Sequence, residues 1–256
     1  MILGSDSDSS PQHFGQKYAG QTSEWMHLDN QANYQHMMLD PVHQAYFLKQ
    51  GWCNPGSITY DINNQGFRSS DFEYDCPGMI ALGCSFTFGS GLPAKDIWPT
   101  LVASTVGVEC WNLAWPGTSA DTCFRLAEYW IPKLRPRLVC MLAPPRDRFE
   151  LLTDIKELPS EVFMPMSQST LISHSDMYLK YWFTKSENGW VNQRKNTLAV
   201  QALCNQLEIP CVIKNADQEM SGTKEQLEYA RDYAHAGPLG HKRLAEKILN
   251  DYNKIK

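Results

Sequence analysis

The chain has 256 residues, a net charge of −5 at pH 7 and a hydrophobic fraction of 43%. These values indicate a folded protein with one large α/β domain and some extensions, and they exclude an intrinsically disordered chain. The acidic balance and the lack of a Lys/Arg-rich stripe argue against a nucleic-acid partner, and no apolar run approaches the roughly 20 residues that span a bilayer.

The first residues and the cysteines bear on localisation. Residues 1–8 contain no basic region and no long apolar core, so we expect no secretion signal. Six of the eight cysteines fall on or beside predicted strands or in predicted helices: Cys84, Cys110, Cys123, Cys140, Cys204 and Cys211. Buried thiols without disulfides are typical of a reducing compartment. We therefore expect a cytoplasmic protein or one associated with a virion or another assembly.

Residues 1–57 are polar and do not show the pattern of a βαβ unit. Four of the seven histidines lie here, at positions 13, 27, 36 and 43, but they lack a tight ligand spacing with carboxylates. We predict no metal site and no cofactor. The segment is interpreted as an N-terminal extension that packs on the core, or that contacts a second copy or another protein.

Residues 58–256 form the predicted main domain. Ile58 to Phe67 suggests a short hairpin or an extended pair with its turn at 64–66, and Arg68 is a candidate for tying this lead-in to the main sheet. Strands are then predicted at 78–84, 108–113, 138–143 and 211–214, and helices at 94–106, 118–134, 192–207 and 238–252. This alternation is typical of a three-layer α/β/α sandwich, for which we expect a parallel five-stranded, flavodoxin-like sheet.

Residues 150–190 are the least regular part of the domain, and they are rich in aromatic residues and methionine. A loop of this length in a compact domain is usually functional, so one interpretation is a lid or a platform for an acyl group or a sugar. The other is that these aromatic residues extend the core over the sheet.

Ser85 is the candidate nucleophile. It lies in the block Gly-Cys-Ser-Phe-Thr-Phe-Gly-Ser-Gly. This block follows the apolar run Met79–Leu82 and precedes a predicted helix. The serine therefore lies at the carboxyl edge of the predicted sheet, where ligands bind in open α/β folds. Taken alone, Gly-x-Ser is too common to indicate catalysis.

Asp232 and His235 supply the groups that a serine nucleophile needs. They stand three residues apart, immediately before the predicted closing helix. In such a turn the carboxylate can hold the imidazole in one tautomer while the other ring nitrogen faces a serine. A helix-leading Asp is often only a cap, but the pairing with the serine block favours a catalytic site.

At this point the sequence resembles the SGNH (GDSL-like) hydrolases. The serine block is similar to the variant in which Cys84 replaces the more familiar Asp, and Asp232-x-x-His235 is similar to the family's final motif. Asn112–Gly117 resembles the second block, which implies that the Gly117 amide binds the oxyanion. The resemblance covers about residues 58–150 and 195–252.

The third block departs from the family's pattern. It normally supplies an Asn side chain to the oxyanion hole, but here the predicted strand 138–143 leads into Pro144-Pro145-Arg146-Asp147-Arg148. Either Arg146 or Arg148 replaces that donor, or the hole has only backbone donors. Surface pairing of these arginines with Asp147 or Glu150 is the structural alternative. Loss of one oxyanion donor typically lowers the rate about a hundred- to a thousand-fold.

The leading hypothesis is a serine esterase in which Ser85, His235 and Asp232 act on a small-molecule or glycan ester. Carbohydrate O-acetyl groups are favoured, because flat aromatic rings stack on sugar faces. Acyl transfer by the same three residues stays open. The alternative from another class is a weak or inactive SGNH-like module with a structural or glycan-binding role in an assembly such as a virion.

Overall fold

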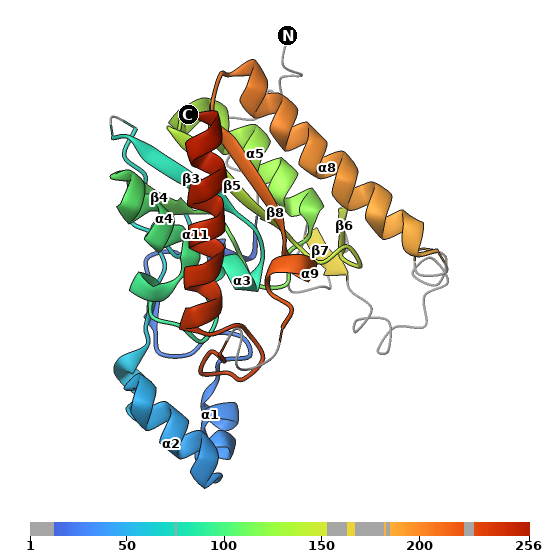
Figure 1. The fold of residues 1–256 in the computed structure, drawn as a ribbon. Coiled ribbons are helices and arrows are strands. Elements are labelled where there is room, and N and C mark those ends of the chain that lie inside the picture. Colours follow the sequence, from blue (N-terminus) through green and yellow to red (C-terminus); the bar gives the residue numbers. More distant parts are fainter. Residues whose placement is uncertain (1–12, 75, 153–162, 167–181, 183–184, 223–227) are drawn as a thin grey trace.

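Four parallel strands form the central sheet of the computed structural model (Figure 1). Across the sheet the order is β4 (Glu109–Asn112), β3 (Gly78–Leu82), β5 (Leu138–Ala143) and β8 (Cys211–Asn215). Every residue of β3 and β5 is buried, because both strands lie in the middle of the sheet and both faces are covered. The structure describes residues 13–74, 76–152, 163–166, 182, 185–222 and 228–256.

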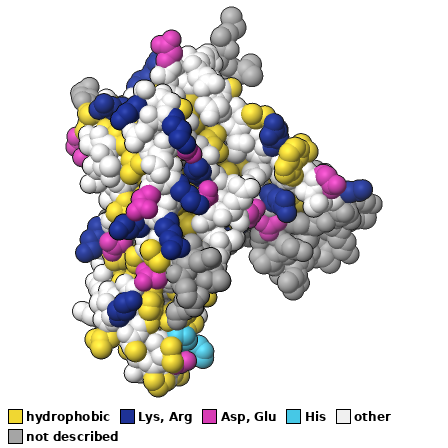
Figure 2. All heavy atoms as spheres, in the orientation of Figure 1, with side chains coloured by type: hydrophobic (Ala, Val, Ile, Leu, Met, Phe, Trp, Pro, Cys, Tyr) yellow, Lys and Arg dark blue, Asp and Glu magenta, His cyan; other side chains and the backbone are white. Residues whose placement is uncertain are grey.

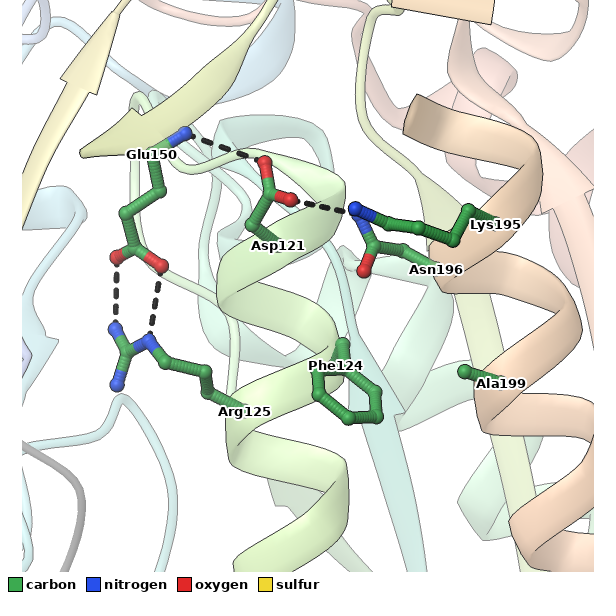
Figure 3. Close-up of a pocket in the computed structure, with 7 residues that line it drawn as sticks. All are labelled: Asp121, Phe124, Arg125, Glu150, Lys195, Asn196 and Ala199. Carbon is green, nitrogen blue, oxygen red and sulfur yellow. Dashed lines mark hydrogen bonds and ion pairs between the residues drawn. The ribbon is translucent and has the colours of Figure 1, made fainter. Parts of the chain in front are cut away.

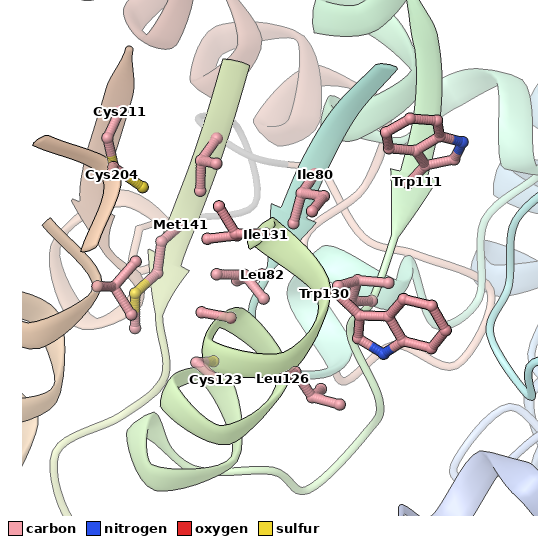
Figure 4. Close-up of a cluster of buried hydrophobic side chains, with 14 of the residues drawn as sticks. Ile80, Leu82, Trp111, Cys123, Leu126, Trp130, Ile131, Met141, Cys204 and Cys211 are labelled. Carbon is pink, nitrogen blue, oxygen red and sulfur yellow. The ribbon is translucent and has the colours of Figure 1, made fainter. Parts of the chain in front are cut away.

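Helices cover both faces of this sheet, which confirms the predicted α/β/α sandwich. On one face lie α5 (Ala120–Leu134) and α8 (Ser186–Gln206), and on the other α4 (Trp98–Val106) and α11 (Pro238–Ile255). Figure 4 shows the core beneath α5, where Ile131 lies over Leu82 and Met141 of the two central strands. A capping box at Ser119 begins α5.

The sheet has four strands among the described residues, so the expectation of five is wrong for this part of the chain. After β5 the chain forms a separate antiparallel pair, β6 (Phe149–Leu152) and β7 (Phe163–Met166). Between β8 and α11, the described residues form the short helix α9 (Ala216–Glu219) and a loop. This connection contains no apolar run long enough to add an edge strand.

The segment 58–67 has its turn at 64–66 as predicted, but it does not form a hairpin of its own strands. Its strand residues, β2 (Tyr60–Asp61), pair instead with β1 (Thr22–Ser23) of the N-terminal extension. The side-chain oxygen of Asn63 accepts hydrogen bonds from the amides of Gln65 and Phe67 and closes a tight turn. This local bonding leaves no second strand in the segment.

The N-terminal extension, as far as it is described, packs on the main domain. It comprises η1 (Phe14–Tyr18), β1, α1 (Gln31–Met37), α2 (Pro41–Gln50) and η2 (Pro55–Ser57). Its aromatic residues Tyr34, Phe47 and Trp52 share one buried cluster with Phe88 and Trp115 of the main domain. Helices α1 and α2 project from the lower end of the molecule in Figure 1.

On the face shown in Figure 2, acidic side chains lie among the basic ones. Over the described residues, no helix combines the length and hydropathy of a membrane span. The proposed lid or platform at 150–190 lies largely outside the described residues. In its described part, Trp182 packs against Phe149 with ring centroids 4.5 Å apart.

Candidate active site

Ser85 is the first residue of a single helical turn, α3 (Ser85–Phe88), which follows directly from β3. The serine is 5% exposed, and its Oγ lies 2.7 Å from Nε2 of His235. Arg68 fixes the other end of this turn by donating hydrogen bonds to the carbonyl oxygens of Phe88 and Gly89. Burial lowers the pKa of Arg68 only to about 10, so the guanidinium stays charged at neutral pH.

Asp232 holds the imidazole of His235 from the other side. One carboxylate oxygen lies 2.6 Å from Nδ1 of His235, and the second accepts hydrogen bonds from the amides of Ala234 and His235. An ionised carboxylate only accepts hydrogen bonds, so Nδ1 carries the ring proton and Nε2 accepts the hydroxyl proton of Ser85. The structure thus brings together the three predicted side chains in the order needed for nucleophile activation.

The serine block and the Asp232–His235 loop touch through their backbones at Gly91. The Gly91 carbonyl accepts a hydrogen bond from the Arg231 amide at 2.9 Å. A Cβ on Gly91 would lie 2.9 Å from the Arg231 nitrogen and 3.0 Å from the Asp232 nitrogen, and its φ is +73°. Glycine is therefore required both by the left-handed backbone and by the close approach of the second loop.

Gly117, the predicted oxyanion donor, lies in the turn after Trp115. Its φ is +84°, and no atom would lie within 4 Å of an added Cβ. The Thr118 hydroxyl bonds the carbonyl oxygens of Trp115 and Gly83 and so joins this turn to the end of β3. The Ser85 amide belongs to the first turn of a helix, where amides lack intrahelical partners. An oxyanion role for the two amides stays a prediction.

Arg146 and Arg148 lie in the loop after β5. Arg146 is exposed and Arg148 half-buried, and the Arg146 carbonyl packs tightly against Gly189 at the start of α8. Within the described contacts, neither guanidinium bonds Ser85 or His235, and neither pairs with Asp147 or Glu150. Glu150 instead forms a bidentate ion pair with Arg125. An oxyanion role for either arginine also remains a prediction.

A hollow of about 330 Å³ lies between α5 and α8, and Ser85 is not among the residues that line it (Figure 3). Four of its polar side chains already have partners: Asp121, Arg125, Glu150 and Asn196. Asp121 accepts hydrogen bonds from the side-chain amides of Asn192 and Asn196 and from the Glu150 backbone, and Arg125 is held by Glu150. These hydrogen bonds join α5 to α8, so we interpret the hollow as part of the packing between the two helices.

His13 and His27, two of the four histidines in the N-terminal extension, pack against aromatic rings. His13 stacks on Phe67 at 4.1 Å, while His27 lies edge-on to Trp115 at 5.4 Å. Partial burial, with further effects from Lys17 and His235, lowers the pKa of His27 to about 4, so this ring is neutral at pH 7. In the described part of the chain, no three His, Cys, Asp or Glu side chains are grouped to hold a metal ion. All eight cysteines are free.

Sequence reasoning missed Asp29 and Arg231. These two residues form a buried ion pair beside the Asp232–His235 loop. The only signal in the sequence was the position of Arg231 directly before Asp232. Nothing in the sequence pointed to Asp29.

No protein-family model matches this chain, and none of the curated proteins matches it. Solved structures similar to the chain include TesA, with 12% identity over 70% of this chain and 99% of that one and a TM-score of 0.38. A GDSL-like lipase from Bacteroides thetaiotaomicron VPI-5482 shares 15% identity over 69% of this chain and 88% of its own, with a TM-score of 0.33.

A family two carbohydrate esterase from Cellvibrio japonicus is similar at 11% identity over 70% of this chain and 61% of that one, with a TM-score of 0.36. At these identities and TM-scores, the activities of the neighbours do not transfer to this chain. Two of these structures are named as a GDSL-like lipase and a carbohydrate esterase.

Proposed function

We propose that this protein is a serine hydrolase of ester bonds. The observation that carries the proposal is the continuous hydrogen-bonded chain from the Ser85 hydroxyl through His235 to Asp232, with links of 2.7 and 2.6 Å. A serine hydroxyl is a weak nucleophile until a neighbouring base accepts its proton. Few structural roles need all three side chains in this arrangement.

In the proposed reaction, Ser85 Oγ attacks the ester carbonyl while His235 Nε2 takes the hydroxyl proton. The resulting imidazolium is stabilised by Asp232, and the oxyanion is held by the amides of Ser85 and Gly117. Collapse of the intermediate breaks the ester bond, and His235 returns the proton to the leaving alcohol. Water, activated by the same imidazole, then releases the acid from Ser85.

The test is turnover of p-nitrophenyl acetate together with labelling by a fluorophosphonate. We expect wild-type protein to react with both, and Ser85→Ala to lose labelling and about 10⁶-fold in kcat. Ser90→Ala is the matched control, since Ser90 lies in the same block, is buried, and its hydroxyl has no hydrogen-bond partner in the described structure. Wild-type protein that neither turns over nor labels contradicts the proposal.

Within this class, we propose carbohydrate O-acetyl groups as the substrate. The support is the aromatic-rich stretch 150–190, most of which lies outside the described residues. Saturable release of acetate from an acetylated xylo-oligosaccharide, at a higher kcat/KM than from p-nitrophenyl acetate, is the expected result. Formation of an acylated product with an added sugar acceptor would instead identify a transferase.

A second candidate is a weak or inactive module with a structural or glycan-binding role in an assembly. It is favoured by the loop after β5, where Pro144 to Arg148 contains no Asn to complete the oxyanion hole. Saturable binding of a glycan by protein that neither labels nor turns over would support this candidate.

A further inference from the structure

A fully buried ion pair joins the N-terminal extension to the Asp232–His235 loop. The Arg231 guanidinium donates from Nε to one Asp29 oxygen at 2.8 Å and from Nη2 to the other at 2.7 Å. The two side chains are 0% and 1% exposed. A bidentate pair of this kind fixes both the distance and the orientation of the guanidinium.

The remaining hydrogen bonds of the Arg231 guanidinium also go to the N-terminal extension. Nη1 donates to the Pro55 carbonyl at 2.6 Å, Nη2 donates to the Glu24 carbonyl at 2.8 Å, and the guanidinium lies 4.4 Å from the Trp25 ring centroid. The side chain that precedes Asp232 in the chain is therefore anchored in residues that are about two hundred positions away.

Tyr60 and Gly91 extend this network to the serine block. The Tyr60 hydroxyl donates to Asp29 at 2.5 Å and accepts a hydrogen bond from the Gly91 amide at 2.8 Å. The Gly91 carbonyl in turn accepts from the Arg231 amide at 2.9 Å. The bonds thus form a closed circuit through the extension, the serine block and the residue before Asp232.

We propose that Asp29 and Arg231 are positioning residues for the active site. The N-terminal extension, which contains Asp29, therefore helps to position the catalytic groups. The proposal rests on the proposed function of Ser85, His235 and Asp232. The pair holds the backbone immediately before Asp232, and this backbone sets where the carboxylate meets His235. Such groups need placement to within about 0.5 Å to be productive.

The experiment replaces the pair with apolar residues of similar size, Asp29→Leu with Arg231→Met. Exchange of a buried ion pair for apolar side chains often preserves stability, whereas removal of one partner leaves an unpaired buried charge. The control is Lys214→Met with Asp251→Leu, which removes an ion pair between β8 and α11. Both double variants are checked for cooperative thermal unfolding before any rate is measured.

We expect kcat of the Asp29/Arg231 double variant to fall by about tenfold to a hundredfold with little change in KM, since only the geometry of the catalytic groups is disturbed. We expect wild-type kcat for the Lys214/Asp251 control. If the double variant does not unfold cooperatively, Arg231→Lys replaces it. The lysine keeps the charge but not the bidentate geometry, and the same fall in kcat is expected.

A second readout does not depend on activity. The proton between His235 Nδ1 and Asp232 should give a low-field NMR resonance in wild-type protein, and this resonance should broaden or move in the Asp29/Arg231 double variant. It should stay in place in the control. An unchanged resonance together with wild-type kcat in a folded double variant overturns the positioning role. Absence of labelling and turnover in wild-type protein overturns the proposed function instead, while the NMR comparison still decides the positioning.

Discussion

Replacement of Gly91 by alanine tests the contact between the two halves of the active site. The added Cβ would lie 2.9 Å from both the Ala230 Cβ and the Arg231 nitrogen, and 3.0 Å from the Asp232 nitrogen. Real Cβ atoms are almost never found this close to such neighbours, and two of the three are backbone atoms that cannot rotate away. The Asp232–His235 loop must therefore move, by up to about 1 Å.

Two separate effects lower the free energy of unfolding of Gly91→Ala. Alanine at a φ of +73° costs about 1–2 kcal/mol, because its Cβ meets the backbone in the left-handed region. Overpacking against the neighbouring loop costs about 1–3 kcal/mol more. We therefore expect Gly91→Ala to lose about 2–5 kcal/mol of stability. A displacement of about 1 Å at a catalytic group lowers the rate about a hundredfold.

Gly107→Ala separates these two terms. Gly107 has nearly the same φ, +75°, but nothing lies within 4 Å of an added Cβ, and it lies at the end of α4. This variant should lose only the backbone term, about 1–2 kcal/mol, and keep the wild-type rate. The assays are urea unfolding and fluorophosphonate inactivation of both variants. Equal inactivation rates for the two would refute the role assigned to the Gly91 contact.

Three further predictions concern single side chains. Asp232→Asn should keep the fold and lower kcat by about 10⁴-fold, because His235 would then favour the wrong tautomer, and a fall below tenfold in ester turnover would contradict this. His241 accepts a hydrogen bond from the Trp98 amide, and burial lowers its pKa to about 3. The stability that the neutral His241 contributes is therefore complete above pH 6.5. It declines toward pH 3, because the unfolded state takes up the proton first. In urea unfolding, the loss of stability between pH 6.5 and 5 should therefore be about 2 kcal/mol smaller in His241→Asn than in wild-type protein. Asp121→Ala should lose about 1–3 kcal/mol for each buried amide donor it leaves unpaired, and a change in urea midpoint within experimental error would refute this.

The main domain was predictable because its signals are local. The strand residues of β3 and β5 are short apolar runs with no alternation, which is the pattern of a strand buried on both faces. The closing helix has an amphipathic pattern after Pro238, and it begins at that residue. The prediction of a fifth strand was wrong, and the hairpin alternative for 58–67 was wrong although its turn is present, because strand pairing depends on which distant segment supplies the partner. Thr22 and Ser23 supply it for β2.

Ser85, His235 and Asp232 could be named from the sequence because each lies in a short motif with a chemical reason for its residue types. Asp29 could not be named, since a single carboxylate in a polar segment has no distinguishing pattern. Its significance comes from Arg231, which is 202 positions away and reaches it only after the extension has packed.

The order of residues along the chain by itself indicated the three side chains for which we propose the chemistry, and it predicted the layered scaffold that carries them. This follows because turn residues, apolar runs and an Asp three positions before a His act over a few residues. Only the tertiary structure decided how the hydroxyl meets the imidazole across 150 positions and what holds that meeting in place. Those contacts depend on the packing of segments from opposite ends of the chain, and no local sequence pattern encodes that packing.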